Sequence, residues 1–296
     1  MKTSQPISHG HQSPPMLWRR RQLGLHAMIL IVLFLSIAPI YILVSISLKN
    51  PLQYEYDRWA ISFPLRFSNY RTELAVVGPY LVNTVFVAVV NCAGVIVLSL
   101  IGGHVFARMR FPFREPLYYA IIALLMVPWI LSFIPSYMVY YSFGLLNTYW
   151  VLIIPAIAGG SVFGIFLTRS FISGIPEEIY EAARCDGAGT LTLLLRISLP
   201  LSTPILATLA TLNVVGTWNS FLWPLVTIND ESKQLIAVGL YHLSSGLGSS
   251  TNGGFSYDVW GPLFAGYVVA SIPLVLVFIF VGRYYVEGLV SSGLKV

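Results

Sequence analysis

The chain has 296 residues, of which 56% are hydrophobic and only 10% are charged, with a formal net charge of +5. Soluble domains carry charge on roughly a quarter of their residues, so this composition excludes an ordinary soluble domain and predicts an all-α polytopic membrane protein. A chain of this length can hold about six spans of roughly 20 residues with their loops. The 2 cysteines, Cys92 and Cys185, cannot form a disulfide framework, and the 5 histidines have no metal-ligand spacing.

Six apolar stretches are long enough to cross about 30 Å of hydrocarbon as transmembrane helices. They cover about 25–48, 80–107, 117–143, 149–171, 201–228 and 262–282. The first stretch follows three arginines at 19–21. Its apolar run exceeds the roughly 7–15 residues of a secretory signal, so we expect a retained membrane anchor.

The basic residues predict the orientation, because loops rich in Lys and Arg stay in the cytoplasm. With the N-terminus inside, the cytoplasmic loops and tails hold twelve of the 17 lysines and arginines. We therefore expect both terminal tails, residues 1–24 and 286–296, to be cytoplasmic. The same reasoning places the loop 173–200, between the fourth and fifth spans, in the cytoplasm.

The loop 173–200 contains a polar segment with helix signals. Pro176 suits the first position of a helix, and the acidic residues after it favour the positive end of the helix dipole. Gly187 can take the left-handed conformation that ends helices. The sequence therefore predicts a short helix over about 177–186. Its alanines let a partner approach the backbone closely, and Glu181 offers a charge to a partner's basic or N–H groups.

The same segment reads Glu181-Ala182-Ala183, then Gly187 and, after nine residues, Ile197-x-Leu199-Pro200. This pattern resembles the cytoplasmic loop by which bacterial ABC importer permeases dock on their ATPase. The residues around it resemble the second membrane subunit of the carbohydrate-uptake, maltose-type branch. The resemblance covers about 25–287 and implies a type I ABC importer permease fold, with a transmembrane domain at 25–285 in a bacterial inner or plasma membrane. It implies that an ATPase cleft receives Glu181, Ala182, Ala183, Asp186, Gly187 and Ala188.

The source of energy is expected to lie outside this chain. A phosphate-binding loop needs a lysine that follows glycine, and none of the lysines does so. We therefore expect no cofactor on this chain. The resemblance implies ATP and Mg on two partner ATP-binding subunits, a homologous second permease and an extracytoplasmic solute-binding protein, with the lipid bilayer as surroundings and no nucleic acid.

Two other functions receive less support from the sequence. A secondary carrier would place ionisable residues deep in the membrane, and no expected span has Asp, Glu, Lys or Arg near its centre. An intramembrane serine protease could use Ser161 after a glycine pair, but it needs a base and no later span contains histidine. We therefore expect a transport subunit without catalytic residues.

The deep polar groups of the expected spans are neutral amides and hydroxyls. Such groups often pair with a neighbouring helix, but in a path they could replace water around sugar hydroxyls, and tryptophans could offer flat faces to sugar rings. The candidates for this path are Asn83, Asn91, Asn213, Trp218, Asn219 and Trp223. The run 218–225 resembles a segment of sugar permeases in which Ser220 replaces a common Asp. We expect a sugar or oligosaccharide as the solute, with another neutral polar solute as the alternative.

The expected outer loop 229–260 is rich in glycine and serine. It could be a flexible linker without a role of its own. In maltose-type relatives the loop at this position reaches into the substrate-binding protein. The resemblance therefore makes Gly246, Gly248, Asn252 and Gly253 candidates for docking that protein.

Overall fold

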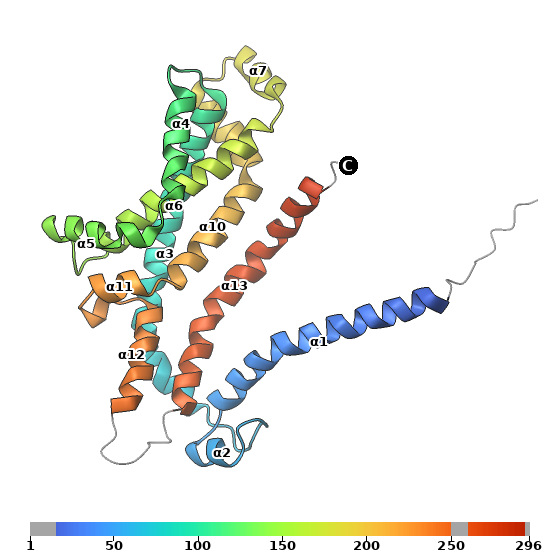
Figure 1. Ribbon diagram of the computed structural model, residues 1–296, viewed down its shortest axis with the longest axis vertical. Helices are drawn as coiled ribbons and strands as arrows, with labels where there is room; N and C mark the ends of the chain where they lie inside the picture. Colours follow the sequence, from blue (N-terminus) through green and yellow to red (C-terminus); the bar gives the residue numbers. More distant parts are fainter. Residues whose placement is uncertain (1–15, 250–259, 294–296) are drawn as a thin grey trace, which may run out of the picture.

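The computed structural model describes residues 16–249 and 260–293, and within these ranges the chain is helical without a strand. The longest helices of the described residues mostly run side by side in one bundle (Figure 1). They are α1 (Met16–Ser47), α3 (Ser68–Arg108), α6 (Trp150–Ser173), α10 (Thr203–Trp218) and α13 (Trp260–Gly293). One end of α1 meets α13, while its N-terminal part projects away from the bundle (Figure 1).

Shorter elements connect the long helices and cap both ends of the bundle. The α-helices among them are α2 (Pro51–Tyr56), α4 (Arg114–Ala123), α5 (Phe133–Ser142), α7 (Glu177–Cys185), α8 (Thr190–Leu193), α9 (Leu199–Leu201), α11 (Leu222–Thr227) and α12 (Ile236–Ser249). Three 3₁₀ turns are η1 (Leu124–Met126), η2 (Trp129–Ser132) and η4 (Glu231–Lys233), and η3 (Leu194–Ser198) is a π-helical turn. In Figure 1, α7 lies at one end of the bundle and α2 at the other.

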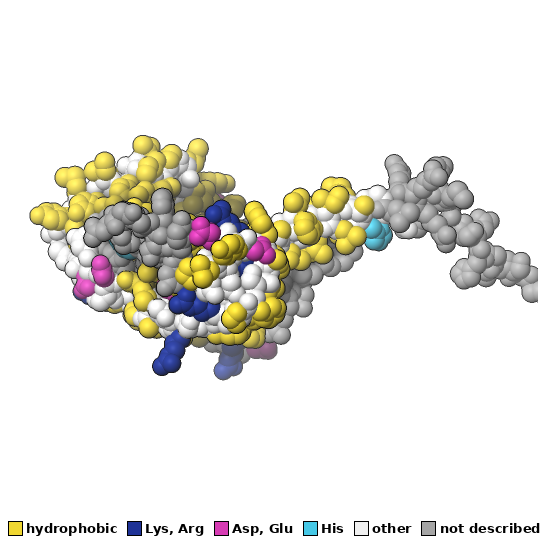
Figure 2. All heavy atoms as spheres, turned by 90° about the horizontal axis from the view of Figure 1, so that it is seen from below, with side chains coloured by type: hydrophobic (Ala, Val, Ile, Leu, Met, Phe, Trp, Pro, Cys, Tyr) yellow, Lys and Arg dark blue, Asp and Glu magenta, His cyan; other side chains and the backbone are white. Residues whose placement is uncertain are grey.

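Four described helices are long and apolar enough to cross a membrane, or up to six if each of two bent helix pairs counts as one span. Their outer faces are apolar, with Leu30, Phe34 and Val89 between 60% and 72% exposed. Figure 2 shows hydrophobic side chains along α1 and over one side of the bundle, whereas Lys, Arg, Asp and Glu side chains gather at the end of the bundle that faces the viewer. A surface of this kind is suited to lipid, because soluble proteins rarely expose such large apolar areas.

Two expected spans are bent rather than continuous. The stretch 117–143 is divided into 114–126 and 129–142, which meet at 91°, because Val127 is extended and Pro128 lacks the N–H that would continue the helix. The stretch expected at 201–228 includes only α10, which ends at Trp218, and the separate α11. The segment before α10 meets it at 74°.

The second span is longer than the apolar pattern indicates. α3 begins at Ser68 rather than at 80, because its first turns are held by polar contacts instead of hydrophobic ones. The buried Asn69 donates from Nδ2 to the carbonyl oxygens of Ser47 at 2.9 Å and Lys49 at 3.0 Å. These bonds join the start of α3 to the end of α1.

Small residues let α3 and α6 approach closely. A Cβ atom added to Gly164 would lie 1.8 Å from Ser99 Oγ, and one added to Gly103 would lie 2.7 Å from Thr168. In membranes, where lipid is as apolar as the core, such close contacts are a main source of helix association. We therefore treat α3 and α6 as one rigid pair.

The expected outer loop 229–260 contains a helix that the sequence analysis missed. α12 occupies Ile236–Ser249, and the N–H of Ile236 donates to Thr84 Oγ1 of α3 at 2.8 Å. Leu235, Ile236 and Val238 are 0–1% exposed. Packing of this apolar start against α3 therefore outweighs the glycine and serine content of the segment.

Candidate functional site

The expected helix of the loop 173–200 is present as α7, Glu177–Cys185. Pro176 precedes the first helical residue rather than occupying it, because its ψ of 136° is not helical. At the other end, Gly187 has a φ of 82°, its N–H donates to Arg184 O, and the N–H of Ala188 donates to Ala183 O. This pair of bonds is a Schellman motif, which glycine at this position permits. The helix therefore has a fixed end.

One face of α7 is buried in the protein and the other is exposed. Tyr180 is 0% exposed and packs in a cluster with Leu100, Ile172 and Leu206, while Ala183 and Ala188 rest on the same cluster. The exposed members of the expected ATPase-docking set are Glu181, Ala182, Asp186 and Gly187. The six candidates therefore divide into two that fix the helix to the bundle and four that are available to a partner.

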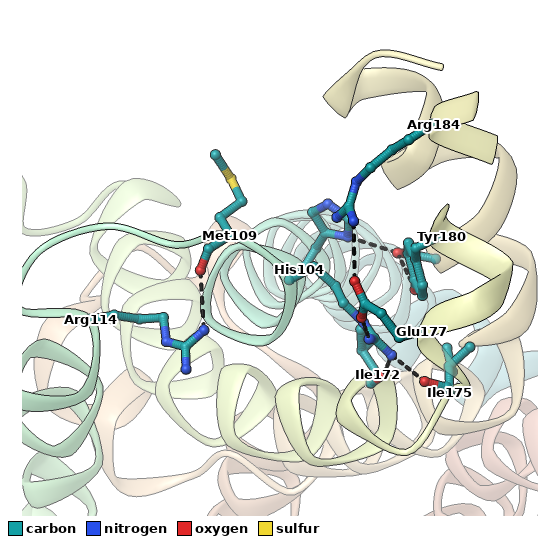
Figure 3. Close-up of polar contacts among 10 residues, drawn as sticks. His104, Met109, Arg114, Ile172, Ile175, Glu177, Tyr180 and Arg184 are labelled. Atoms are coloured by element: carbon teal, nitrogen blue, oxygen red, sulfur yellow. Dashed lines mark hydrogen bonds and ion pairs between the residues drawn. The ribbon is translucent and has the colours of Figure 1, made fainter. Parts of the chain in front are cut away.

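Glu177 of α7 lies close to Ile172 and Ile175 at the end of α6 (Figure 3). Arg108, the last residue of α3, holds these two parts together. Its guanidinium donates to the carbonyl oxygens of Ile172, at 2.6 Å, and Ile175, and forms an ion pair with Glu177. It also lies 4.2 Å from the centre of the Tyr180 ring. Partial desolvation acts to raise the pKa of Glu177, but the hydrogen bond from Arg184 and the charge of Arg108 outweigh it and hold that pKa below its ordinary value.

A second, buried contact joins α7 to α3 through the π-helical turn η3. Ser198 Oγ lies 2.7 Å from His104 Nδ1 and 2.9 Å from the hydroxyl of Tyr180. All three residues are at most 2% exposed. Ser198 therefore links α7 and α3 to η3, which leads through α9 and the 74° bend into α10.

Sequence reasoning missed these supporting residues. No motif in the sequence distinguishes Arg108 or His104 from other residues near the ends of apolar stretches. Their partners are 64 to 94 positions away along the chain, so no local pattern points to them. The one local feature that points to Arg108 is a basic residue at the end of an apolar helix, and this feature is too common to identify a contact.

A cavity of about 530 Å³ lies farther along the bundle, between α3, α6, α10 and the bent segment that contains η2 and α5. Three of the candidates for a solute path, Asn91, Asn213 and Trp223, line it. Its other lining residues are Val87, Trp129, Ser132, Phe133, Ser136, Leu152, Pro155, Ala156, Gly159, Leu212, Gly216, Thr217, Ser220 and Leu235. None of these residues carries a charge.

The cavity has unused hydrogen-bonding groups beside an aromatic wall. Asn91 is 1% exposed, and its Oδ1 has no hydrogen-bond partner within the described chain, while Nδ2 lies 3.4 Å from Thr217 Oγ1. The Trp223 indole donates to Val151 O at 2.8 Å. Its ring lies at 87° to that of Phe133, with the two ring centres 5.3 Å apart. A polar solute can therefore find acceptors, donors and ring faces here.

The other three candidates for the path lie outside the cavity lining. Trp218 is 6% exposed and packs with Val77, Ile236 and Ala270. Asn83 donates from Nδ2 to Ser232 O and Gln234 O, so it holds the segment before α12. Asn219 is exposed and donates to Val215 O one turn earlier. A polar or aromatic residue type alone could not distinguish these structural roles from a place in the cavity.

The candidates for docking a binding protein are only partly described. Gly246 and Gly248 belong to the last turns of α12, whereas Asn252 and Gly253 lie outside the described residues.

Comparisons with known proteins find membrane permeases of binding-protein-dependent transport systems. The family described as "Binding-protein-dependent transport system inner membrane component" matches residues 96–290. The diacetylchitobiose uptake system permease protein NgcG of Streptomyces coelicolor is 32% identical over 271 residues, 90% of this chain and 87% of that protein. The sn-glycerol-3-phosphate transport system permease protein UgpE of Yersinia enterocolitica is 30% identical over 288 residues, 94% of this chain and 99% of that protein.

A solved structure shares the fold. It is a crystal structure of a bacterial ABC transporter involved in the import of the acidic polysaccharide alginate, with a TM-score of 0.79 at 23% identity over 93% of this chain and 99% of that chain. A second structure, the alginate transporter in complex with an alginate pentasaccharide-bound periplasmic protein, has a TM-score of 0.57 at 17% identity.

Proposed function

The chain belongs to the family of binding-protein-dependent transport system inner membrane components, and we propose that it serves an ATP-driven importer of an uncharged saccharide. It is a permease subunit, a multi-pass membrane protein and not itself an enzyme. The proposal concerns its partners, the solute and the residues that perform transport.

The importer would contain two ATP-binding subunits, a homologous second permease and an extracytoplasmic solute-binding protein. ATP and Mg would be bound on the ATP-binding subunits. The two termini and α7 would face the cytoplasm, as the excess of basic residues on that side supports. The last turns of α12, at the opposite end (Figure 1), would meet the binding protein, and residues 252–253 of the sequence would take part in this contact.

The observation that carries this proposal is the construction of α7. A nine-residue helix is marginal alone in water. This one is attached to the bundle on its buried face by Tyr180 and through its first turn by Arg108. Its outer face carries Glu181 and small residues, so a partner can approach the backbone and find a charge. This is the form expected of a docking helix that must transmit force without unfolding.

Transport would follow from the connections of α7. Closure of the ATPase pair moves α7, and Arg108 transmits the displacement to α3 and the end of α6. Ser198 transmits it to η3, and thus toward α10, which carries Asn213 and Thr217 of the cavity. Reorientation of these helices changes the cavity from inward-open to outward-open, and hydrolysis on the partner subunits resets it.

The uncharged cavity lining supports a neutral saccharide over an anionic solute. Phosphate and carboxylate groups are bound in proteins chiefly by Arg, Lys and backbone N–H groups, and no charged side chain lines the cavity. Relatives named for neutral saccharides include the diacetylchitobiose permease and an arabinooligosaccharides transport system permease of Halalkalibacterium halodurans. Another neutral polar solute is the alternative.

The test is uptake into proteoliposomes that contain this chain, its partner permease, the ATP-binding subunits and the binding protein. We expect accumulation of a labelled neutral oligosaccharide only with internal ATP, and loss of accumulation with Glu181→Lys. Glu178→Lys, an equal charge change on α7, is the control. Uptake that persists without ATP would contradict the proposal.

A further inference from the structure

The turn between α3 and α4 forms a second pocket, of about 440 Å³, that the transport cycle above does not use. It is lined by Arg110, Phe111, Phe113, Arg114, Glu115 and Pro116. Arg108, just before it, contacts α7, so the pocket lies at the α7 end of the bundle (Figure 3). A pocket here lies where a membrane span leaves the bilayer.

Positive charge exceeds negative charge in and beside this pocket. Glu115 accepts two hydrogen bonds from Arg169, at 2.7 and 2.8 Å, and one from Arg114 at 3.0 Å. Arg114 also donates to Met109 O at 3.2 Å. Arg110 is exposed and makes no hydrogen bond or ion pair within the described chain. Arg114 and Arg169 therefore share the single carboxylate of Glu115, and the exposed Arg110 is left without a counter-charge.

An apolar stripe runs from the pocket along α4. Leu117 and Leu124, which follows the last residue of α4, are 50% and 58% exposed, and their spacing of seven places them on one helix face. Phe113, just before α4 with a φ of 61°, lines the pocket and is 75% exposed. α4 packs on the protein through Tyr118, which is buried and whose ring centre lies 3.6 Å from the Arg169 guanidinium. The basic pocket and the apolar stripe together match the two parts of a phospholipid, a phosphate and an acyl chain.

We propose that this pocket is a binding site for an anionic phospholipid, with the headgroup phosphate on Arg110 and Arg114 and an acyl chain along Phe113 and Leu117. Arginine binds phosphate oxygens with paired N–H groups, and basic pockets beside spans select anionic headgroups. The acyl chain distinguishes this ligand from a free phosphate, which would use the arginines alone.

The experiment titrates phosphatidylglycerol into the detergent-purified importer complex and counts bound lipid by native mass spectrometry. We expect Arg110→Gln to weaken binding about fivefold. Arg110→Lys, which keeps the charge, should retain most of the affinity. Arg71→Gln removes an exposed arginine near the other end of α3 and should bind like the parent. Phosphatidylcholine should bind more weakly than phosphatidylglycerol.

Three results would overturn the proposal. Equal binding of phosphatidylglycerol by the parent and Arg110→Gln would remove the site. Competition by inorganic phosphate at the same concentration as the lipid would identify a simple anion site. Loss of the ATP-binding subunit from Arg110→Gln with unchanged lipid binding would assign the pocket to a protein partner.

Discussion

Arg108 connects parts of the chain that no other described side chain joins in this way: the end of α3, the end of α6 and the start of α7. The carbonyl of Ile172, in the last turn of α6, accepts from the N–H of Ile175 at 3.1 Å as well as from Arg108. A cation at this place also suits the negative end of the helix dipole. Arg108 therefore stabilises α6 and positions α7 with the same group.

Arg108→Lys tests this role. Lysine keeps a charge for Glu177, but its single ammonium cannot reproduce the fork that reaches Ile172 and Ile175 together. Loss of hydrogen bonds from a charged group should cost about 2 kcal/mol, so amide exchange in residues 176–186 should become about 30-fold faster. Hydrogen exchange with mass spectrometry measures this, and Arg71→Lys is the control. Unchanged exchange would show that Arg108 does not hold α7.

The free oxygen of Asn91 should matter for transport. Asn91→Leu keeps the size of the side chain but removes the acceptor from the cavity, so the apparent KM for saccharide uptake should rise about fivefold, the value of one hydrogen bond. Asn219→Leu alters an exposed amide outside the cavity and should leave KM unchanged. Equal effects of the two variants would remove Asn91 from the solute path.

The lowered pKa of Glu177 fixes the pH range of the α7 contacts. A carboxyl whose folded pKa lies below its unfolded value, about 4.3, stabilises the fold above that value and loses this effect as the pH falls through the folded pKa. Hydrogen exchange of the amides of residues 177–186, corrected for the intrinsic exchange rate, can be measured at each pH. It should stay constant from neutral pH to about pH 5 and rise only in stronger acid. Glu177→Gln should remove this acid dependence, and a rise near pH 6 would contradict the assignment.

Among the elements, the pair α3–α6 depends on glycine at its contact. Gly164→Ala would place a methyl group 1.8 Å from Ser99 Oγ, so one of the helices must shift. Overpacking of this kind costs about 1–3 kcal/mol. The midpoint of thermal unfolding in detergent should therefore fall, whereas Gly159→Ala on the same helix meets nothing within 4 Å and should not lower it. Equal midpoints would show that the two helices separate freely.

Hydropathy predicts the limits of helices that face lipid. It predicts less well the limits that depend on contacts within the protein. The expected limits 25–48 and 149–171 lie within two residues of the corresponding candidate spans, 24–47 and 150–173. The start of α3 depends on Asn69 and the start of α12 on Thr84, and both contacts join residues distant in sequence. Hydropathy also could not fix the bend at Pro128, because proline interrupts some spans and is tolerated in others. Pro155 lies inside the continuous helix α6.

Across the whole molecule, the α7 end and the cavity are joined by the rigid pair α3–α6 and by the bent path through η3 into α10. The sequence could predict α7, because its cap, its glycine stop and its family pattern are local. It could not separate Asn91 from Asn83, since one lines the cavity and the other holds the segment before α12. Only the fold decides which deep amide lines the cavity.

The most direct measurement of motor coupling is cross-linking from Cys185, which is exposed at the end of α7. Cys92 is replaced by serine, and the chain is co-expressed in membranes with its ATP-binding subunit, which carries a cysteine in its docking cleft. We expect a cross-link whose yield changes with nucleotide and falls with Glu181→Lys. An assembled complex with a reactive Cys185 but without this cross-link would contradict docking through α7.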